Sequence, residues 1–261
     1  MKLLFSAILV IFLFSSFKPT NDLKRFFDDY NVIGSIVIFD KNNSKFIYYD
    51  SLRCSNQYTP ASTFKIFNSL AALEAGVIKD TTHVIPWDSI TRAYQSWNND
   101  QNLKSAFKHS TVWFYQELAR RIGEKKMFKY IRKNHYGNQN INGGIDLFWL
   151  KGDLRISQME QIEFLKKLYE KKLKFKTKNQ EIVKDIMLME IKSNYRLYAK
   201  TGWSIENENG ISYGLYVGFI ETPNNTFFFA TNIETTTPDK KFLAARKEIT
   251  MKVLTELEIV E

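Results

Sequence analysis

The residues best suited to covalent chemistry in this sequence are a serine and a lysine three positions apart. Ser62 and Lys65 stand at the start of residues 66–73, a segment that is apolar on nearly every face and is therefore predicted to be a buried helix. Residues three apart share one face of a helix, so the Lys65 amine can reach the Ser62 hydroxyl and act as its base. A helix N-terminus also offers free N–H groups and a positive dipole to an oxyanion.

The base is expected to be lysine because histidine is scarce in this chain. Its 3 histidines, His83, His109 and His135, are neither four residues apart nor next to a cluster of acidic residues. The first spacing is typical of zinc ligands on a helix, and a serine triad needs a histidine with an acidic partner. The sequence also lacks a glycine-rich phosphate loop. We therefore expect neither a metal site nor a phosphate-binding loop.

Two further motifs distinguish Ser62 from the other serines that precede a lysine by three positions. Residues 15–18 and 105–108 have the same spacing, so the spacing alone identifies nothing. Ser62, however, is followed along the chain by Ser110-Thr111-Val112, predicted to start a helix, and by Lys200-Thr201-Gly202, predicted to end a strand. A glycine lets a ligand lie against the strand edge, and a lysine offers a cation to an acidic substrate.

This order of motifs resembles that of the penicillin-recognising acyl-serine enzymes, which carry Ser-x-x-Lys, a second serine and Lys-Thr-Gly. Within that superfamily, Ser110-Thr111-Val112 is similar to the Ser-x-Val of class D β-lactamases, the oxacillinase type, whereas transpeptidases and class A enzymes usually have Ser-x-Asn. Four further stretches agree with class D: Pro60-Ala61-Ser62-Thr63-Phe64-Lys65, Tyr136-Gly137-Asn138, Phe148-Trp149-Leu150 and Arg155-Ile156-Ser157. The resemblance covers essentially the whole chain after the first 32 residues.

The resemblance implies that Ser62 is the acylated nucleophile and that Lys65, N-carboxylated by CO₂ or bicarbonate, is its base. Ser110 would pass a proton toward the lactam nitrogen, and no other cofactor is expected. The backbone N–H groups of Ser62 and Trp203 would form the oxyanion hole. The remaining implied site residues are Lys200, Thr201, Gly202 and Arg246, which would bind the substrate carboxylate, and Val112, Trp149 and Leu150, which would form an apolar pocket around Lys65. Trp149 would also donate its indole N–H to the carbamate.

The chemistry explains why such a lysine needs apolar neighbours. An ordinary lysine ammonium has a pKa near 10.4, so it must be desolvated before it can act as a base or react with CO₂. Once carboxylated, the same side chain is an anionic base that can activate both the serine and a deacylating water. That second step separates a hydrolase from a protein that only traps penicillin.

The predicted strands lie at the two ends of the chain, and the predicted helices lie between them. Residues 34–40 and 45–49 form a hairpin candidate, and three C-terminal strands are predicted over 196–200, 211–220 and 226–232. Helical periodicity is found over 112–122 and 157–168, where Ser157 and Glu160 have capping-box spacing, and again over 242–257. The fold class is therefore α/β (α+β). We expect an antiparallel sheet flanked by terminal helices, a central all-helical lobe and a cleft between them, the penicillin-recognising serine transpeptidase-like fold.

The first residues have the layout of a signal peptide. One lysine precedes a short apolar run that ends in small residues, and the run is shorter than the roughly 20 residues of a spanning helix. Residues 1–17 are therefore predicted to direct export to the periplasm, with the cleavage point left open, and no stable membrane insertion is expected after their removal. Residues 18–261 would form a single β-lactamase domain with two lobes.

The composition is that of an ordinary globular protein. The chain has 261 residues, of which 44% are hydrophobic, and a net charge of +9 from charges that are dispersed along the sequence. Dispersed charge is typical of a solvated surface, and no nucleic-acid motif accompanies it. The expected partners are therefore β-lactam small molecules and not nucleic acid, and a homodimer is left open.

Two alternatives to a hydrolase share the same motifs. One is a β-lactam sensor or penicillin-binding protein that acylates without turnover. A sensor is disfavoured because it would need several spanning helices and a cytosolic partner domain. The other is a cell-wall carboxypeptidase or transpeptidase, disfavoured by Val112 in place of asparagine. The substrate range, carbapenems included, depends on loop geometry around Trp97, Leu150 and Trp203.

Overall fold

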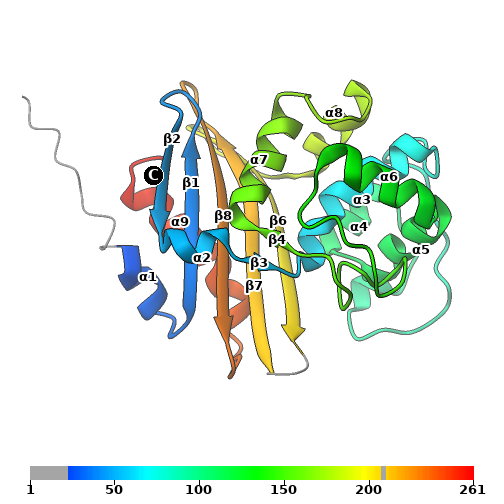
Figure 1. The fold of residues 1–261 in the computed structure, drawn as a ribbon, viewed down its shortest axis with the longest axis horizontal. Coiled ribbons are helices and arrows are strands. Elements are labelled where there is room, and N and C mark those ends of the chain that lie inside the picture. Colours follow the sequence, from blue (N-terminus) through cyan, green and yellow to red (C-terminus); the bar gives the residue numbers. More distant parts are fainter. Residues whose placement is uncertain (1–22, 207–209) are drawn as a thin grey trace, which may run out of the picture.

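The computed structural model describes residues 23–206 and 210–261, so the predicted signal segment 1–17 lies outside the described residues. A twisted sheet forms one side of the molecule and a group of helices forms the other (Figure 1). Within the described residues, no helix has the length and apolar character needed to cross a membrane.

The sheet has the strand order β2-β1-β8-β7-β6-β5, and every neighbouring pair is antiparallel. Its strands are β1 (Ile33–Asp40), β2 (Lys45–Tyr49), β5 (Leu188–Ile191), β6 (Arg196–Glu206), β7 (Ile211–Glu221) and β8 (Thr226–Thr235). The predicted hairpin is β1–β2, and β8 places the C-terminal strands directly beside it. The predicted fold class, with strands from both ends of the chain in one antiparallel sheet, is confirmed. The short edge strand β5 was not predicted because its residues show no alternation.

The prediction that Lys200-Thr201-Gly202 ends a strand is wrong. β6 continues to Glu206, and its register with β7 runs from Arg196 opposite Glu221, through Lys200 opposite Val217, to Glu206 opposite Ile211. Gly202 marks a close approach within the strand, because a Cβ there would lie 3.0 Å from the Pro60 carbonyl oxygen. The motif therefore lies in the middle of β6, against the turn that carries Ser62.

The helices divide between the two faces of the sheet and the helical lobe. They are α1 (Arg25–Asp28), α2 (Ser51–Ser55), α3 (Lys65–Ala75), α4 (Leu103–His109), α5 (Val112–Ile122), α6 (Glu124–Asn134), α7 (Gln158–Tyr169), α8 (Thr177–Ile186) and α9 (Phe242–Glu256), with the 3₁₀ turns η2 (Ala61–Phe64) and η3 (Gln95–Trp97). The short strands β3 (Gln57–Tyr58) and β4 (Ile156–Ser157) pair beside α7. Helix α7 packs on β8 and β1, whereas α9 packs on β7 and β8 from the opposite face. The helices predicted over 112–122, 157–168 and 242–257 are confirmed, as is the capping box of Ser157 and Glu160.

Helix α3 is the centre of the helical lobe. Residues 65–73 are all buried, and the helix packs against α5, α6 and α8. Its apolar character on every face therefore reflects neighbours on every side, as the sequence predicted. The 3₁₀ turn η2, which leads directly into α3, contacts β6, so the N-terminal end of the buried helix lies beside the sheet.

Candidate active site

Ser62 and Lys65 are brought together by a change of helix type. Ser62 lies in the 3₁₀ turn η2, and Lys65 is the first residue of α3. In a 3₁₀ turn, side chains three residues apart point in the same direction, so they lie closer together than the same pair on an α-helix. Lys65 Nζ and Ser62 Oγ are hydrogen bonded at 2.7 Å. The predicted pair is therefore adjacent, within the distance needed for proton transfer.

Burial disfavours the charged form of Lys65. The side chain is fully buried, and its Nζ lies 5.3 Å from the centre of the Tyr115 ring. Burial, and secondarily the nearby Lys200, hold the pKa of the Lys65 amine well below its ordinary value. A neutral amine has a free lone pair, so it can accept the Ser62 proton.

Trp149 lies behind the serine and leaves one polar atom without a partner. Its ring is fully buried and stacks on the Phe64 ring, with the ring centres 5.3 Å apart. The Trp149 carbonyl oxygen accepts a hydrogen bond of 3.0 Å from the Ala61 N–H. The indole Nε1 is buried, and no atom of the described residues accepts its hydrogen. Buried N–H groups are nearly always hydrogen bonded, so this donor indicates room for an acceptor that the chain itself does not supply.

Ser110 lies at the junction of two helices. It ends α4 in the left-handed conformation, with φ of 55°, and α5 begins at Val112. The helix start predicted at Ser110-Thr111-Val112 is therefore confirmed, although Ser110 itself belongs to the end of α4. Its half-buried side chain and that of Val112 line the cavity that contains Ser62.

The sheet side of the site carries two buried cations. Burial and the neighbouring Arg246 and Lys247 lower the pKa of Lys200 to about 7. Arg246, on α9, is also buried, which lowers its pKa to about 10, and its Nη1 donates to the Gly202 carbonyl. Arg246 is therefore charged at neutral pH, whereas the charge of Lys200 depends on what binds beside it.

A cavity of about 370 Å³ brings most of the predicted site residues together. Its lining includes Ser62, Ser110, Val112, Leu150, Thr201, Gly202, Trp203 and Arg246 from the predicted set, together with Tyr94, Trp97, His109 and Leu243. Lys65, Trp149 and Lys200 are buried behind this lining. No acidic side chain of the described residues lines the cavity, so it favours an anionic ligand.

Tyr94, His109 and Leu243 were not predicted. The rings of Tyr94 and Trp97 pack at a tilt with their centres 4.8 Å apart, and the Trp97 indole donates to the His109 carbonyl at 3.0 Å. Tyr94 lies in a stretch with little regular structure, so periodicity gave no signal there, and His109 is the last residue of α4. Leu243 is at the start of α9, where it reads as an ordinary helix residue. Only the tertiary fold, which brings α4, the start of α9 and the stretch with Tyr94 to one cavity, places these residues at the site.

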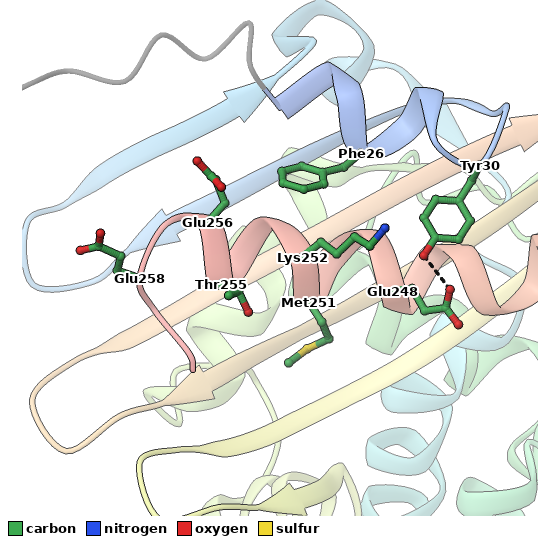
Figure 2. A pocket seen from close by; sticks show the side chains of 8 residues that line it. All are labelled: Phe26, Tyr30, Glu248, Met251, Lys252, Thr255, Glu256 and Glu258. Carbon is green, nitrogen blue, oxygen red and sulfur yellow. Dashed lines mark hydrogen bonds between the residues drawn. The ribbon is translucent and has the colours of Figure 1, made fainter.

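A larger hollow, of about 770 Å³, lies on the outer side of α9 where α1 approaches it (Figure 2). Figure 2 shows the Tyr30 hydroxyl pointing to Glu248, to which it donates at 2.7 Å, with Lys252 between Tyr30 and Phe26. None of the predicted site residues lines this hollow. The reactive groups therefore belong to the smaller cavity beside β6.

Comparison with known proteins agrees with this geometry. A family model described as the penicillin binding protein transpeptidase domain matches residues 17–255, and the chain belongs to that family. Beta-lactamase OXA-20 of Pseudomonas aeruginosa is 42% identical over 241 residues, which cover 90% of this chain and 88% of that protein. Beta-lactamase OXA-48 of Klebsiella pneumoniae is 43% identical over 234 residues, which cover 90% and 87%.

Solved structures define the class within the family. The class D β-lactamase YbXI from Nostoc superposes with a TM-score of 0.86 at 45% identity, covering 90% of this chain and 98% of that one. The class D β-lactamase FUS-1 (OXA-85) from Fusobacterium nucleatum subsp. polymorphum gives a TM-score of 0.87 at 39% identity, covering 92% and 99%. This chain is a class D serine β-lactamase. The regulatory protein BlaR1 of Bacillus licheniformis is 39% identical over 213 residues, which cover 82% of this chain but only 35% of BlaR1.

Proposed function

We propose that this enzyme hydrolyses β-lactam antibiotics through an acyl-enzyme on Ser62, with N-carboxylated Lys65 as the general base. The observation that carries the proposal is the 2.7 Å contact between Ser62 Oγ and the fully buried Lys65 Nζ. A serine hydroxyl is a weak nucleophile until an adjacent base takes its proton. Lys65 is the one base in contact with it among the described residues.

Acylation then follows from the positions of three side chains. Lys65 takes the Ser62 proton, and Ser62 Oγ forms a bond to the lactam carbonyl carbon. The resulting oxyanion lies between the backbone N–H groups of Ser62 and Trp203, which line the same cavity. The ring C–N bond breaks as Ser110 passes its proton to the lactam nitrogen and receives the Ser62 proton from Lys65, which leaves Lys65 free to act as a base again. In deacylation, Lys65 takes a proton from water, the new C–O bond forms, and the ester oxygen leaves with a proton as the Ser62 hydroxyl.

The surroundings of Lys65 support carboxylation. CO₂ reacts with a neutral amine, and burial favours that form of Lys65 by lowering its pKa. The unpartnered indole N–H of Trp149 offers a buried donor, and Val112 and Leu150 supply apolar contacts nearby. Lys200 opposes a positive charge on Lys65, but the same cation would stabilise an anionic carbamate. The charge of Lys200 therefore disfavours the Lys65 ammonium but would favour the Lys65 carbamate.

The substrate carboxylate would bind on the sheet side of the cavity. Arg246 and Lys200 supply positive charge there, and Thr201 and Gly202 line the adjoining stretch of β6. A bound carboxylate would raise the pKa of Lys200 from about 7. Lys200 would then be protonated when the substrate is bound. Binding of an anion would therefore offset the repulsion between Lys200 and Arg246.

Hydrolysis can be separated from sensing by one experiment. We expect purified mature protein to hydrolyse a chromogenic cephalosporin over many turnovers, and Ser62→Ala to abolish both turnover and the penicillin adduct seen by mass spectrometry. Similarity to part of BlaR1 keeps the sensor as the second candidate. A single stoichiometric burst in the wild type would favour it, and an adduct on Ser62→Ala would remove Ser62 as the nucleophile.

We also propose that residues 1–17 direct export to the periplasm and that residues 18–261 form the mature two-lobed domain. The support is the charged, apolar and small-residue order of the first residues. N-terminal sequencing of protein from a periplasmic fraction tests this. A mature chain that begins at Met1 would contradict it.

A further inference from the structure

The turn that presents Ser62 has an unfavourable backbone conformation. Ala61, the residue before the nucleophile, has φ of +47°, in the left-handed region that residues with a side chain rarely adopt. Such a conformation persists only where the surrounding structure holds it. One support is the hydrogen bond from the Ala61 N–H to the Trp149 carbonyl. The position of Ser62 therefore depends on contacts outside the turn.

A second support comes from helix α7. The N–H and the hydroxyl of Thr63 both donate to the Pro60 carbonyl, at 3.0 and 2.7 Å, and this closes the turn around Ala61 and Ser62. Gln161 Nε2 donates to Thr63 Oγ1 at 3.1 Å. Both side chains are buried, so water cannot replace this bond. A continuous chain of hydrogen bonds thus connects Gln161 on α7 to the Pro60 carbonyl, two residues before Ser62.

The amide of Gln161 is incompletely paired in the interior. Its Oε1 is buried without a partner of normal geometry among the described residues, and the Tyr136 hydroxyl lies close enough to the Gln161 and Thr63 side chains to interact with both. Incompletely paired polar groups in the interior lower stability, and an apolar side chain of the same length would avoid that cost. The hydrogen bond from Gln161 Nε2 to Thr63 Oγ1 is therefore the contact through which this amide acts on the turn.

We propose that Gln161 is a positioning residue for acylation: through Thr63 and the Pro60 carbonyl, it holds the strained turn so that the hydroxyl and the N–H of Ser62 stay in place. The inference rests on the proposed role of Ser62 as the nucleophile. It predicts that Gln161 affects the tetrahedral transition state, which uses both groups of Ser62, more than the initial binding of the substrate.

Gln158 provides a matched control on the same helix. It is also buried, but its Nε2 donates to the carbonyls of Ser35 and Ala230 in the sheet, on a different path from the turn. The test compares Gln161→Met with Gln158→Met. The readouts are the second-order rate of penicillin acylation followed by mass spectrometry, the affinity for a boronic acid that forms a tetrahedral adduct on Ser62, and the melting temperature.

We expect only Gln161→Met to lose about tenfold in acylation rate and in boronic acid affinity, the size of one lost hydrogen bond. Gln158→Met breaks two hydrogen bonds to the sheet and should melt at a lower temperature, whereas Gln161→Met also removes an incompletely paired amide and should shift the melting temperature less. Gln158→Met should stay within about twofold of the wild type in both, the range usual for a change away from the site. Wild-type acylation by Gln161→Met, or equal losses in the two variants, would overturn the proposal.

A second pair of variants covers the case in which Gln161→Met does not fold. Thr63→Val removes the bridging hydroxyl at nearly constant volume and should show the same loss, and Thr63→Ser should restore most of the rate. Equal rates for the valine and serine variants would overturn the proposal. Acylation without turnover in the wild type would remove the hydrolase function but leave this comparison intact, whereas the absence of any Ser62 adduct would overturn both.

Discussion

Two buried lysines lie behind the lining of the same cavity, one at the start of α3 and the other on β6, and their neighbours give them different chemistry. Burial lowers the pKa of both amines. On the helical side, Lys65 contacts the hydroxyl of Ser62 and the ring of Tyr115. On the sheet side, Lys200 lies near Arg246, with its Nζ 5.6 Å from the centre of the Phe107 ring. The comparison shows that desolvation alone does not decide what a buried lysine does.

The partner of each lysine decides its role. A neutral amine beside a hydroxyl can take a proton from it, so the proposed mechanism assigns the base to the helical side. A lysine whose neighbour is a permanent cation gains most from an arriving anion, so the proposed mechanism assigns the binding of the substrate carboxylate to the sheet side. The predictions below alter one side at a time.

The largest effect is expected from the permanent cation of the sheet side. Arg246→Ala should lower kcat/KM for a penicillin by roughly 10- to 100-fold, because it removes a charge-assisted contact to the carboxylate. The exposed Arg132 on α6 provides a control, and Arg132→Ala should leave kcat/KM unchanged. Steady-state kinetics measures both. An unchanged kcat/KM in Arg246→Ala would remove Arg246 from the site.

The next effect concerns stability and pH. The pKa of Lys200 in the folded protein, about 7, lies below its ordinary value of 10.5. Between these two pH values the unfolded chain binds more protons, so the free energy of unfolding rises with increasing pH. Lys200→Met should remove this part of the slope, at most about 1.4 kcal/mol per pH unit, and stabilise the protein near pH 7.

Denaturant unfolding at several pH values between 7 and 10 measures this slope. The exposed Lys133→Met serves as a control and should retain the wild-type slope. If Lys200→Met kept the full slope, burial would not be the reason for the lowered pKa, and the comparison between the two lysines would fail on the sheet side.

A smaller effect is expected on the helical side. Val112→Thr puts a hydroxyl into the apolar surroundings of Lys65, which should weaken the desolvation that keeps the amine neutral. The bicarbonate concentration needed for half-maximal activity should rise a few-fold, with little change in activity at saturating bicarbonate. Val84, which is exposed and outside the cavity, offers the matched control Val84→Thr. An unchanged bicarbonate requirement in Val112→Thr would count against the apolar pocket.

Much of this arrangement could be predicted from the sequence because the relevant signals are local. The uninterrupted apolar character of residues 66–73 predicted a helix with neighbours on every side, and α3 has them. The spacing of Ser62 and Lys65 predicted their contact. The order of motifs predicted which distant segments meet, and most of those residues line one cavity.

The remainder depends on tertiary contacts that leave no local pattern. Gly202 resembles a strand end in the sequence, yet it lies within β6 because the Pro60 carbonyl approaches it. Nothing in the sequence around Ala61 indicates a positive φ, since the conformation is imposed by hydrogen bonds from residues far along the chain. The residues around Tyr94 show no helical or strand periodicity, and Tyr94 lines the cavity because its loop packs there beside Trp97.

Carbon-13 NMR with labelled bicarbonate tests the account most directly, because the two lysines are expected to respond differently. We predict one carbamate signal in active wild-type protein, its retention in Lys200→Met and its loss in Lys65→Ala. Activity should fall in CO₂-stripped buffer and below neutral pH, where protonation favours carbamate breakdown, and added bicarbonate should restore it. An active wild-type enzyme without a carbamate signal, at a rate indifferent to CO₂, would show that Lys65 acts as a free amine and would contradict the account.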